Sequence, residues 1–533
     1  MTRLELEAMP LTTQLLGKLN KALVDRSVRE GFALLDRSRR DLGSLTAGSP
    51  HAVAYLLCIA QWVDLGYRDF AYLDELFSRF ADVPRASMLL ADYVRLRLVE
   101  ALRAFVAEDV EQAISIFGFV LQVEAGIVEA HLAVVAHYWK GRAHRRQGQY
   151  ELALHHIGEA KRLAQEMNAP KLVAVTKIHE SWLLFQRGQR RDAFRLLDEA
   201  EAELKSTGHA LSLGNIESAR GRFVRRSGEY TTAIAHFERA VEIYAGHVPE
   251  HPNLARALVN AAYVKRLIAF DLRHRSRSGR AKGPDHARYL EVCQEALELL
   301  RRAEDIYSRQ HHQAGTGSVL VNAGHLHLDS GDLDRAEDEA KKAFLLGEEK
   351  QDHILMARAR ILQSAIQNER AEEQLGESTD TAMHAHLARN FAEEAIVLAK
   401  LTQNSRLLAG AYVARASAAA NEFFQDWETA KHFAALAGEK LGKDDLDHLS
   451  KQLSLLKTRI LRATGIDEML RAWSEGIVGD KTFQQVTEEF AELVIPKVWA
   501  REGRKIARVA EQLSISPKKV RRILNNLDML RTP

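Results

Sequence analysis

Small and apolar residues recur along this chain at a fixed spacing. In three stretches a glycine is followed five residues later by alanine, nine residues later by a bulky apolar residue and twelve residues later by a second alanine. The three glycines, Gly148, Gly188 and Gly228, are 40 residues apart. Glycine permits a tight turn between two helices, and alanine lets the helices approach each other closely. The pattern therefore predicts a repeated helical hairpin.

The same template extends in both directions from these stretches. It predicts nine hairpins over about residues 50–460, with two longer steps where the chain carries insertions. Their close-approach alanines are Ala71, Ala113, Ala153, Ala193, Ala233, Ala296, Ala336, Ala388 and Ala430. Residues 1–50 are predicted to form two more helices, about 11–24 and 26–42, which cap the amino-terminal end of the array.

The first insertion is rich in arginine, serine and glycine. Residues 273–285 are predicted to form a basic loop between two hairpin helices near 254–272 and 288–309, because so polar a segment buries too little apolar surface to become ordered.

Composition narrows the class of protein. The 533 residues are 46% hydrophobic and 27% charged, which excludes a disordered chain, and 7% are aromatic, which favours helices over sheets. The two cysteines, Cys58 and Cys293, are far apart, as expected of buried thiols in a reducing cytosol. The first residues include acids where a signal peptide needs an apolar core, and no 18 apolar residues run together. We therefore expect a cytoplasmic protein without membrane contact.

The order of small residue, turn glycine, aromatic or leucine, then alanine, bulky residue and alanine resembles the tetratricopeptide repeat (TPR) family. The standard unit has about 34 residues, and this chain is similar to the longer variants of about 40. The resemblance implies an all-α fold, in which residues 51–465 form a right-handed α-solenoid of TPR-like helical hairpins. It also implies that the first helices of the hairpins line a concave groove for a protein or peptide partner.

The resemblance places a set of side chains on that groove. Two near copies, 257–263 and 318–325, each carry an asparagine that would bond the backbone amide of an extended peptide, because a carboxamide donates and accepts at once. The alternative is an asparagine bonded to a neighbouring hairpin or to water. The predicted groove residues are Tyr138, Arg142, Arg145, Trp182, Arg222, Arg225, Asn260, Tyr263, Asn322 and His325.

Positive charge is concentrated near the carboxyl end. The whole chain has a net charge of only +2, whereas residues 497–531 hold ten bases and three acids. A local basic patch of this kind is typical of proteins that bind a phosphate backbone.

Within this basic region, residues 504–524 have the pattern of a helix-turn-helix. Ala510 is small where two helices cross, Ser516 can cap the second helix, and Pro517 fits its first position. Val520, Leu524 and Leu527 are expected to pack inward. The basic side chains between them would then face the major groove.

The stretch 482–527 resembles the Fis-type carboxyl-terminal module of bacterial regulators. It implies that residues 466–533 form a three-to-four-helix domain that binds duplex DNA through residues 497–531 and dimerises through residues 482–500. The implied DNA-binding residues are Lys505, Arg508, Lys518, Lys519, Arg521, Arg522 and Asn525.

The stretch departs from the Fis-type pattern at four positions. Lys505 stands in place of an asparagine, Ser514 in place of a glycine, and Pro517 in place of an arginine, while Pro496 is expected to kink the dimer helix. The departures at Lys505 and Pro517 bear on base preference, and Pro496 bears on dimer geometry.

Motifs of catalysis are missing from the sequence. It contains no G-x-x-x-x-G-K-[ST], no H-E-x-x-H and no G-x-S-x-G, and its histidine pairs lack clustered cysteine or acidic ligands. We therefore expect a protein that is not an enzyme and holds no metal or cofactor. The sequence favours a cytoplasmic, bacterial-type transcriptional regulator that associates with the nucleoid when bound to DNA. The alternative is a TPR scaffold or adaptor whose basic end is a cap or a partner-docking site.

Overall fold

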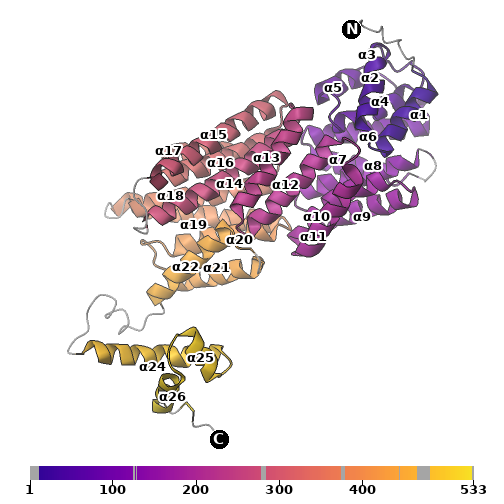
Figure 1. Cartoon of the computed structure of the whole chain (residues 1–533). Coiled ribbons are helices and arrows are strands. Elements are labelled where there is room, and N and C mark those ends of the chain that lie inside the picture. Colours follow the sequence, from indigo (N-terminus) through magenta and orange to yellow (C-terminus); the bar gives the residue numbers. More distant parts are fainter. Residues whose placement is uncertain are drawn as a thin grey trace. The chain divides into compact units, whose positions relative to one another are not determined.

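The computed structural model confirms the all-α prediction (Figure 1). It describes residues 11–123, 127, 129–277, 284–373, 378–442, 445–464, 481–527 and 529–530. Over these ranges the regular elements are 25 α-helices and one short 3-10 helix, η1 (Arg85–Ser87), and no strand occurs. The chain divides into two compact units, unit 1 over residues 1–456 and unit 2 over residues 457–533.

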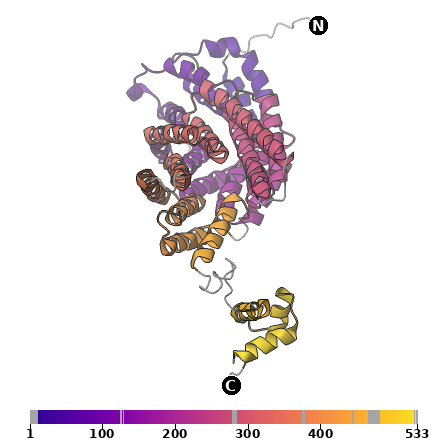
Figure 2. The same ribbon diagram turned by 90° about the vertical axis from the view of Figure 1, so that its left-hand side faces the viewer.

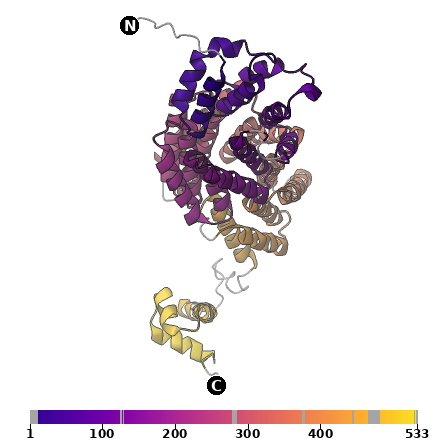
Figure 3. The ribbon, with the colours of Figure 1, turned by 90° about the vertical axis from the view of Figure 1, so that its right-hand side faces the viewer.

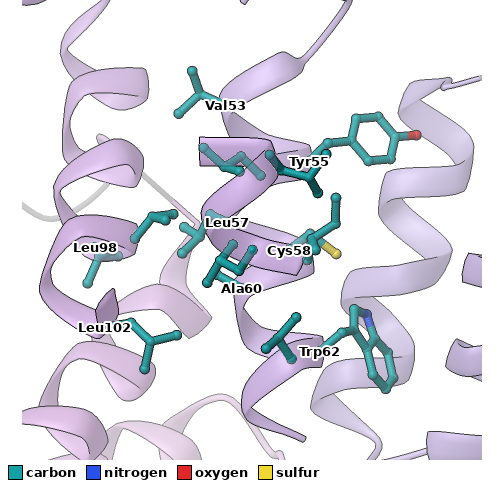
Figure 4. Packing of buried hydrophobic residues seen from close by; sticks show 14 of the residues in the cluster. Val53, Tyr55, Leu57, Cys58, Ala60, Trp62, Leu98 and Leu102 are labelled. Carbon is teal, nitrogen blue, oxygen red and sulfur yellow. The ribbon is translucent and has the colours of Figure 1, made fainter. Parts of the chain in front are cut away.

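Unit 1 begins with the three helices of the predicted cap. They are α1 (Thr13–Val24), α2 (Val28–Arg37) and α3 (Arg39–Gly43), so the second expected helix is divided in two. They share one apolar core with the first hairpins, in which α4 (Ala52–Asp64) is buried on nearly all sides. Figure 4 shows Leu98 and Leu102 beside Leu57 of α4, with Tyr55 and Trp62 pointing to the other side. The cap and the array therefore fold as one body.

Nine helical hairpins follow, as the repeat pattern predicts. They are α4 with α5 (Phe70–Ser78), α6 (Leu90–Val106) with α7 (Val110–Val120), α8 (Ala130–Arg146) with α9 (Tyr150–Glu166), α10 (Pro170–Gln186) with α11 (Arg190–Leu204), α12 (Ala210–Arg226) with α13 (Tyr230–His247), α14 (Pro252–Arg277) with α15 (Pro284–Arg309), α16 (Gln313–Ser330) with α17 (Leu333–Glu349), α18 (His353–Glu373) with α19 (Ser378–Lys400), and α20 (Ser405–Ala419) with α21 (Trp427–Lys440). The next helix is α22 (His448–Thr464).

Eight of the nine expected close-approach alanines are fully buried. The ninth, Ala71, is exposed, so that assignment is wrong. Helix α5 has only nine residues, and it buries the larger Leu73 and Leu76 against the cap-side core instead.

The ends of the predicted basic loop are helical. Helix α14 continues to Arg277 and α15 begins at Pro284, so only residues 278–283 of the expected loop lie outside these helices, and these residues also lie outside the described part of the chain. The extension of α14 corrects the prediction that the chain leaves helical conformation at residue 273.

The three turn glycines adopt the conformation that the hairpin requires. Gly148, Gly188 and Gly228 have φ angles of +77°, +79° and +78°, in the left-handed region that L side chains adopt only with strain.

The solenoid winds tightly enough for successive turns to touch (Figure 2 and Figure 3). The amide of Gln403 donates to the carbonyl of Gly148 at 2.9 Å, and the amide of Leu446 donates to the carbonyl of Arg226 at 2.8 Å. The amide of Ala314 donates to the carboxylate of Glu108 at 3.0 Å, across 206 residues of sequence. With a repeat of forty residues, one superhelical turn takes about five hairpins.

The described part of unit 2 folds around its own core. It contains α24 (Phe483–Arg501), α25 (Ile506–Gln512) and α26 (Pro517–Asn526). Helix α24 begins with a capping box between Thr482 and Gln485 and stays helical through Pro496 to its end at Arg501. Its core is formed by Ile495, Val498, Trp499, Val509, Ala510, Val520, Ile523 and Leu524.

Candidate functional site

A cavity of about 110 Å³ lies within unit 1, between the first helices of several hairpins. Helices α4, α8, α10, α12 and α14 all contribute to its lining, because the first helix of each pair faces the inside of the superhelix. Five of the ten predicted groove residues line it, namely Tyr138, Arg142, Arg145, Trp182 and Arg222. We call this cavity the arginine pocket, since its lining also includes Arg26 and Arg256.

One arginine of the pocket has a carboxylate partner. The Arg142 guanidinium donates to both carboxylate oxygens of Asp64, at 2.9 and 2.7 Å, and the Trp139 indole donates to the same group at 2.9 Å. Burial alone would raise the pKa of Asp64, but the charge and hydrogen bond of Arg142, together with the Trp139 donor, hold that pKa below its usual value. The Asp64 carboxylate is therefore ionised and fully engaged.

The other pocket arginines on the repeat helices bond to neutral groups. Arg145 donates to the His179 ring at 3.2 Å, Arg222 donates to the Ser218 carbonyl at 3.2 Å, and Arg256 donates to the side chains of Asn215 and Asn253. Within the described residues, none of these three guanidinium groups forms an ion pair.

Burial and the charges of neighbouring arginines lower the pKa of two of these guanidinium groups. Burial first, and then the charges of Arg256 and Arg145, lower the pKa of Arg222 to about 9. Burial and the charges of Arg256 and Arg142 likewise lower the pKa of Arg145 to about 10. Both guanidinium groups still carry their charge at neutral pH, so the pocket is strongly cationic.

Arg145, His179 and Tyr138 are linked by hydrogen bonds whose donors and acceptors can be assigned. Because a guanidinium only donates, His179 Nδ1 must accept from Arg145, and the neutral ring then carries its proton on Nε2. That proton is donated to the Tyr138 hydroxyl, 2.8 Å away. The hydroxyl proton of Tyr138 is thus left for another acceptor. Burial, followed by the charges of Arg145 and Arg142, keeps the pKa of His179 well below its usual value, which supports the neutral ring.

Two deeply buried side chains of the lining have unsatisfied polar atoms. His209 is 3% exposed, and neither of its ring nitrogens has a hydrogen-bond partner in the described structure. Arg26 is 9% exposed, and its Nε also lacks a partner there. Buried polar groups are nearly always paired in native proteins, so these atoms are open to a hydrogen-bond partner from outside the chain.

The other five predicted groove residues lie outside the pocket lining. Arg225 stacks over the Tyr263 ring, with its Cζ 4.6 Å from the ring centroid. Asn260 donates its amide to the Arg256 carbonyl at 2.8 Å, one turn earlier in its own helix.

Asn322 and His325 also lie outside the pocket lining. Asn322 donates to the Ser318 carbonyl at 2.7 Å and is only 4% exposed. Asn322 is therefore buried, whereas Asn260 is half-buried, and the peptide-binding role expected for the two asparagines stays a prediction. His325 is half-buried, and burial, followed by the charge of Arg266, keeps its pKa well below the usual value.

The polar side chains of the pocket that were not predicted from the sequence include Arg26, Asp64, His179, His209 and Arg256. Arg26 belongs to the connection between the first two helices, and His209 immediately precedes α12, so neither follows the hairpin template. His179 occupies the first helix of a recognised hairpin, and its position on the inner face is the signal that could have found it.

The second candidate surface is the basic side of unit 2. Helices α25 and α26 are joined by the four residues 513–516, and the Ser516 hydroxyl accepts the Lys519 amide at 3.2 Å as the predicted cap. Val520, Ile523 and Leu524 are buried, whereas Leu527, expected to pack inward, is exposed because α26 ends before it.

The predicted DNA-contact residues lie on the outside of this unit. Lys519 is half-buried, and the other six are exposed, namely Lys505, Arg508, Lys518, Arg521, Arg522 and Asn525. Arg522 forms an ion pair with Glu488 of α24. The remaining basic side chains of α26 form no ion pair within the described chain.

No cluster of three or more potential metal ligands occurs among the described residues. The helices of the described chain also include none that is long and apolar enough to cross a membrane.

Comparisons with known proteins establish the fold of the solenoid. No protein-family model and no curated protein matches this chain. A solved structure of a Rap protein complexed with Competence and Sporulation Factor is similar, with a TM-score of 0.50 and 14% identity over 72% of this chain and 98% of that chain. The Rap conjugation gene regulator of plasmid pLS20 has a TM-score of 0.42 and 14% identity, over 73% of this chain and 96% of its own. The apo quorum sensor NprR from B. thuringiensis has a TM-score of 0.36 and 14% identity, over 80% and 98%. The fold of this chain is thus a TPR-like α-solenoid.

Proposed function

We propose that this protein is a cytoplasmic DNA-binding transcriptional regulator and not an enzyme. Its solenoid binds a protein or peptide partner, and unit 2 binds duplex DNA through a Fis-type helix-turn-helix. The observation that carries the DNA half is the division of α26 into a buried apolar face and an exposed basic face. An exposed row of cations on a short helix is the arrangement by which a recognition helix meets the major groove.

The geometry next to α26 supports this proposal. A four-residue turn joins α25 to α26, and Ser516 caps the second helix so that its first turn, with Lys518 and Lys519, is held rigidly. Lys505 and Arg508 add exposed charge at the start of α25. We assign Lys505, Arg508, Lys518 and Arg521 to phosphates, and Lys519 and Arg522 to the groove. Arg522 would exchange its Glu488 partner for DNA.

The solenoid half rests on the fold and on the arginine pocket. The Rap protein with the same fold was solved with Competence and Sporulation Factor bound, so this type of array can hold a partner. In the present chain, the inward-facing helices enclose a polar cavity instead of a continuous apolar core. A pocket on the concave wall is where a repeat protein of this shape receives its ligand.

A second copy of the chain is the proposed partner of α24. Phe483 is 87% exposed and Phe490 is 49% exposed, and their spacing of seven residues places them on one face with Val486 between them. This spacing is typical of helix–helix seams. A dimer would present two basic helices to adjacent turns of the duplex.

The salt dependence of DNA binding by the full chain tests the regulator proposal. A gel-shift titration on a short mixed-sequence duplex should show binding that weakens steeply as salt rises, because each neutralised phosphate adds about 0.9 to the slope of log K against log salt. The double variant Lys518→Gln with Arg521→Gln should lower that slope by about 2. The matched control is Arg335→Gln with Lys341→Gln, which removes the same charge from exposed positions of α17 and should leave the slope unchanged.

The alternative is a scaffold or adaptor that does not bind DNA. Absence of binding even at low salt would favour it and reject the regulator. Equal losses in the α26 variant and the α17 control would mean that net charge, and not the basic face of α26, accounts for the attraction.

A further inference from the structure

Two buried arginines elsewhere in unit 1 have acidic partners. Arg266 pairs with Asp329 at 2.5 Å, and Arg406 pairs with Asp447. This is the usual arrangement, because a guanidinium removed from water needs a counter-charge. The arginine pocket departs from it.

Five arginines line the pocket, against one carboxylate. Among the described residues that line it, Asp64 is the only acidic one, and both of its oxygens accept hydrogen bonds from Arg142. Arg26, Arg145, Arg222 and Arg256 have no ion pair in the described part of the chain. The fold thus holds four guanidinium groups together without an anion to balance them.

Three side chains of the pocket have hydrogen-bonding positions without a partner in the described structure. Tyr138 has a hydroxyl proton that the His179 ring does not take, by the direction of the hydrogen bonds established above. His209 is buried with both ring nitrogens unpartnered, and the Nε of Arg26 is unpartnered as well. A bound anion would balance the arginines and accept the hydroxyl proton of Tyr138.

We propose that the arginine pocket binds a carboxylate of an acidic peptide, held by the guanidinium groups of Arg145 and Arg222 with the Tyr138 hydroxyl as a further donor. The inference rests on the proposed function of the solenoid as a peptide receptor and specifies the chemistry of its ligand. The planar guanidinium fork matches the two oxygens of a carboxylate.

The pocket has room for a small polar group. Its volume of about 110 Å³ is several times what one water molecule needs, so a carboxylate with its adjoining carbons fits. The rest of the peptide would lie along the inward-facing helices, where the Trp182 ring supports Arg145, whose Cζ lies 5.3 Å from the ring centroid.

Calorimetric titration of the full chain with defined peptides tests this assignment. The probe is tetraglutamate with both ends blocked, and the control peptide is tetraglutamine blocked in the same way. We expect tetraglutamate to bind and tetraglutamine not to bind. Arg145→Gln and Arg222→Gln should each weaken tetraglutamate binding about tenfold or more, the range for loss of a charged hydrogen bond.

Two control variants separate a specific site from general charge. Arg222→Lys keeps the charge and should retain more affinity than Arg222→Gln. Arg239→Gln removes an exposed arginine of α13, with 68% of its side chain exposed, and should leave binding unchanged. Circular dichroism of each variant checks that the helices are intact.

Equal binding of the two peptides, or an equal loss in Arg239→Gln and Arg222→Gln, would overturn the proposal. A parallel titration with inorganic phosphate distinguishes the source of the anion. Phosphate binding that depends on Arg222, without binding of tetraglutamate, would exclude a peptide carboxylate as the ligand. The gel shift on the same preparations is independent, so DNA binding without tetraglutamate binding rejects the pocket assignment alone, and the reverse result rejects the DNA-binding role alone.

Discussion

Replacing Gly148 by alanine should destabilise unit 1 more than the same replacement at Gly188. Both glycines have the same left-handed φ, at +77° and +79°, so the backbone strain of an added Cβ is the same in both. They differ in what lies beyond the hairpin turn. At Gly148 the next superhelical turn is in contact, whereas a Cβ at Gly188 meets no atom of the described chain within 4 Å.

The expected magnitudes follow from these contacts. An alanine in left-handed conformation costs about 1–2 kcal/mol, which is the whole expected effect at Gly188. At Gly148 the new Cβ lies 2.9 Å from the Thr402 Cβ and 3.3 Å from the Ile354 Cδ1, so it also forces two side chains apart. Such overpacking adds about 1–3 kcal/mol. Gly148→Ala should therefore cost about 2–5 kcal/mol in total.

Amide hydrogen exchange is the suitable assay, because long repeat arrays do not unfold in a single cooperative step. The Gln403 amide donates to the Gly148 carbonyl at 2.9 Å, and the Gln403 side chain accepts the Glu151 amide at 2.8 Å. Both amides report on the contact between superhelical turns. Their exchange should become much faster in Gly148→Ala and stay near wild type in Gly188→Ala.

Equal exchange at Gln403 in the two variants would refute this reasoning. It would mean that the contact between turns adds nothing to the stability of the solenoid, and that the glycine is needed only for its own turn.

Three more predictions concern the pocket and the dimer helix. Arg142→Met should destabilise unit 1 by about 3–5 kcal/mol, since it leaves Asp64 charged and buried without its ion-pair partner. Arg222→Met should cost less, because Arg222 has no ion pair in the described chain. Hydrogen exchange of both variants checks this, and equal losses in the two would contradict the reasoning. Burial, with the charge of Arg26 second, lowers the pKa of His209 to about 3, below its unfolded value, so its contribution to stability is complete above about pH 6.5 and is lost as the pH falls toward 3. Between pH 7 and pH 5 the loss should be about 2 kcal/mol, and hydrogen exchange in His209→Gln should show a correspondingly flatter pH dependence. Phe490→Glu should convert a dimer to a monomer in sedimentation velocity; an unchanged mass would place the dimer contact elsewhere.

The hairpin array could be predicted from the sequence because its determinants are local. A turn glycine such as Gly148 and a small residue such as Ala153 act within one hairpin, at separations of a few residues. The same applies to Ser516 and Pro517, whose roles at the start of α26 depend only on the neighbouring backbone. Where a hairpin departs from the common length, as at Ala71, the local template assigned the wrong residue.

The arginine pocket could be predicted only in part. Tyr138, Arg142, Arg145, Trp182 and Arg222 follow from the register of the first helices, which fixes the face that turns inward.

Only the tertiary structure shows which charged residues lie together in the pocket. Asp64 and Arg142 are 78 residues apart, and Glu108 and Ala314 are 206 residues apart. Small rotations between successive hairpins accumulate into the superhelical turn, and no short segment of sequence encodes their sum. The repeat therefore determined the hairpin. The packing of one hairpin on the next determined that four arginines without an ion pair among the described residues share one cavity.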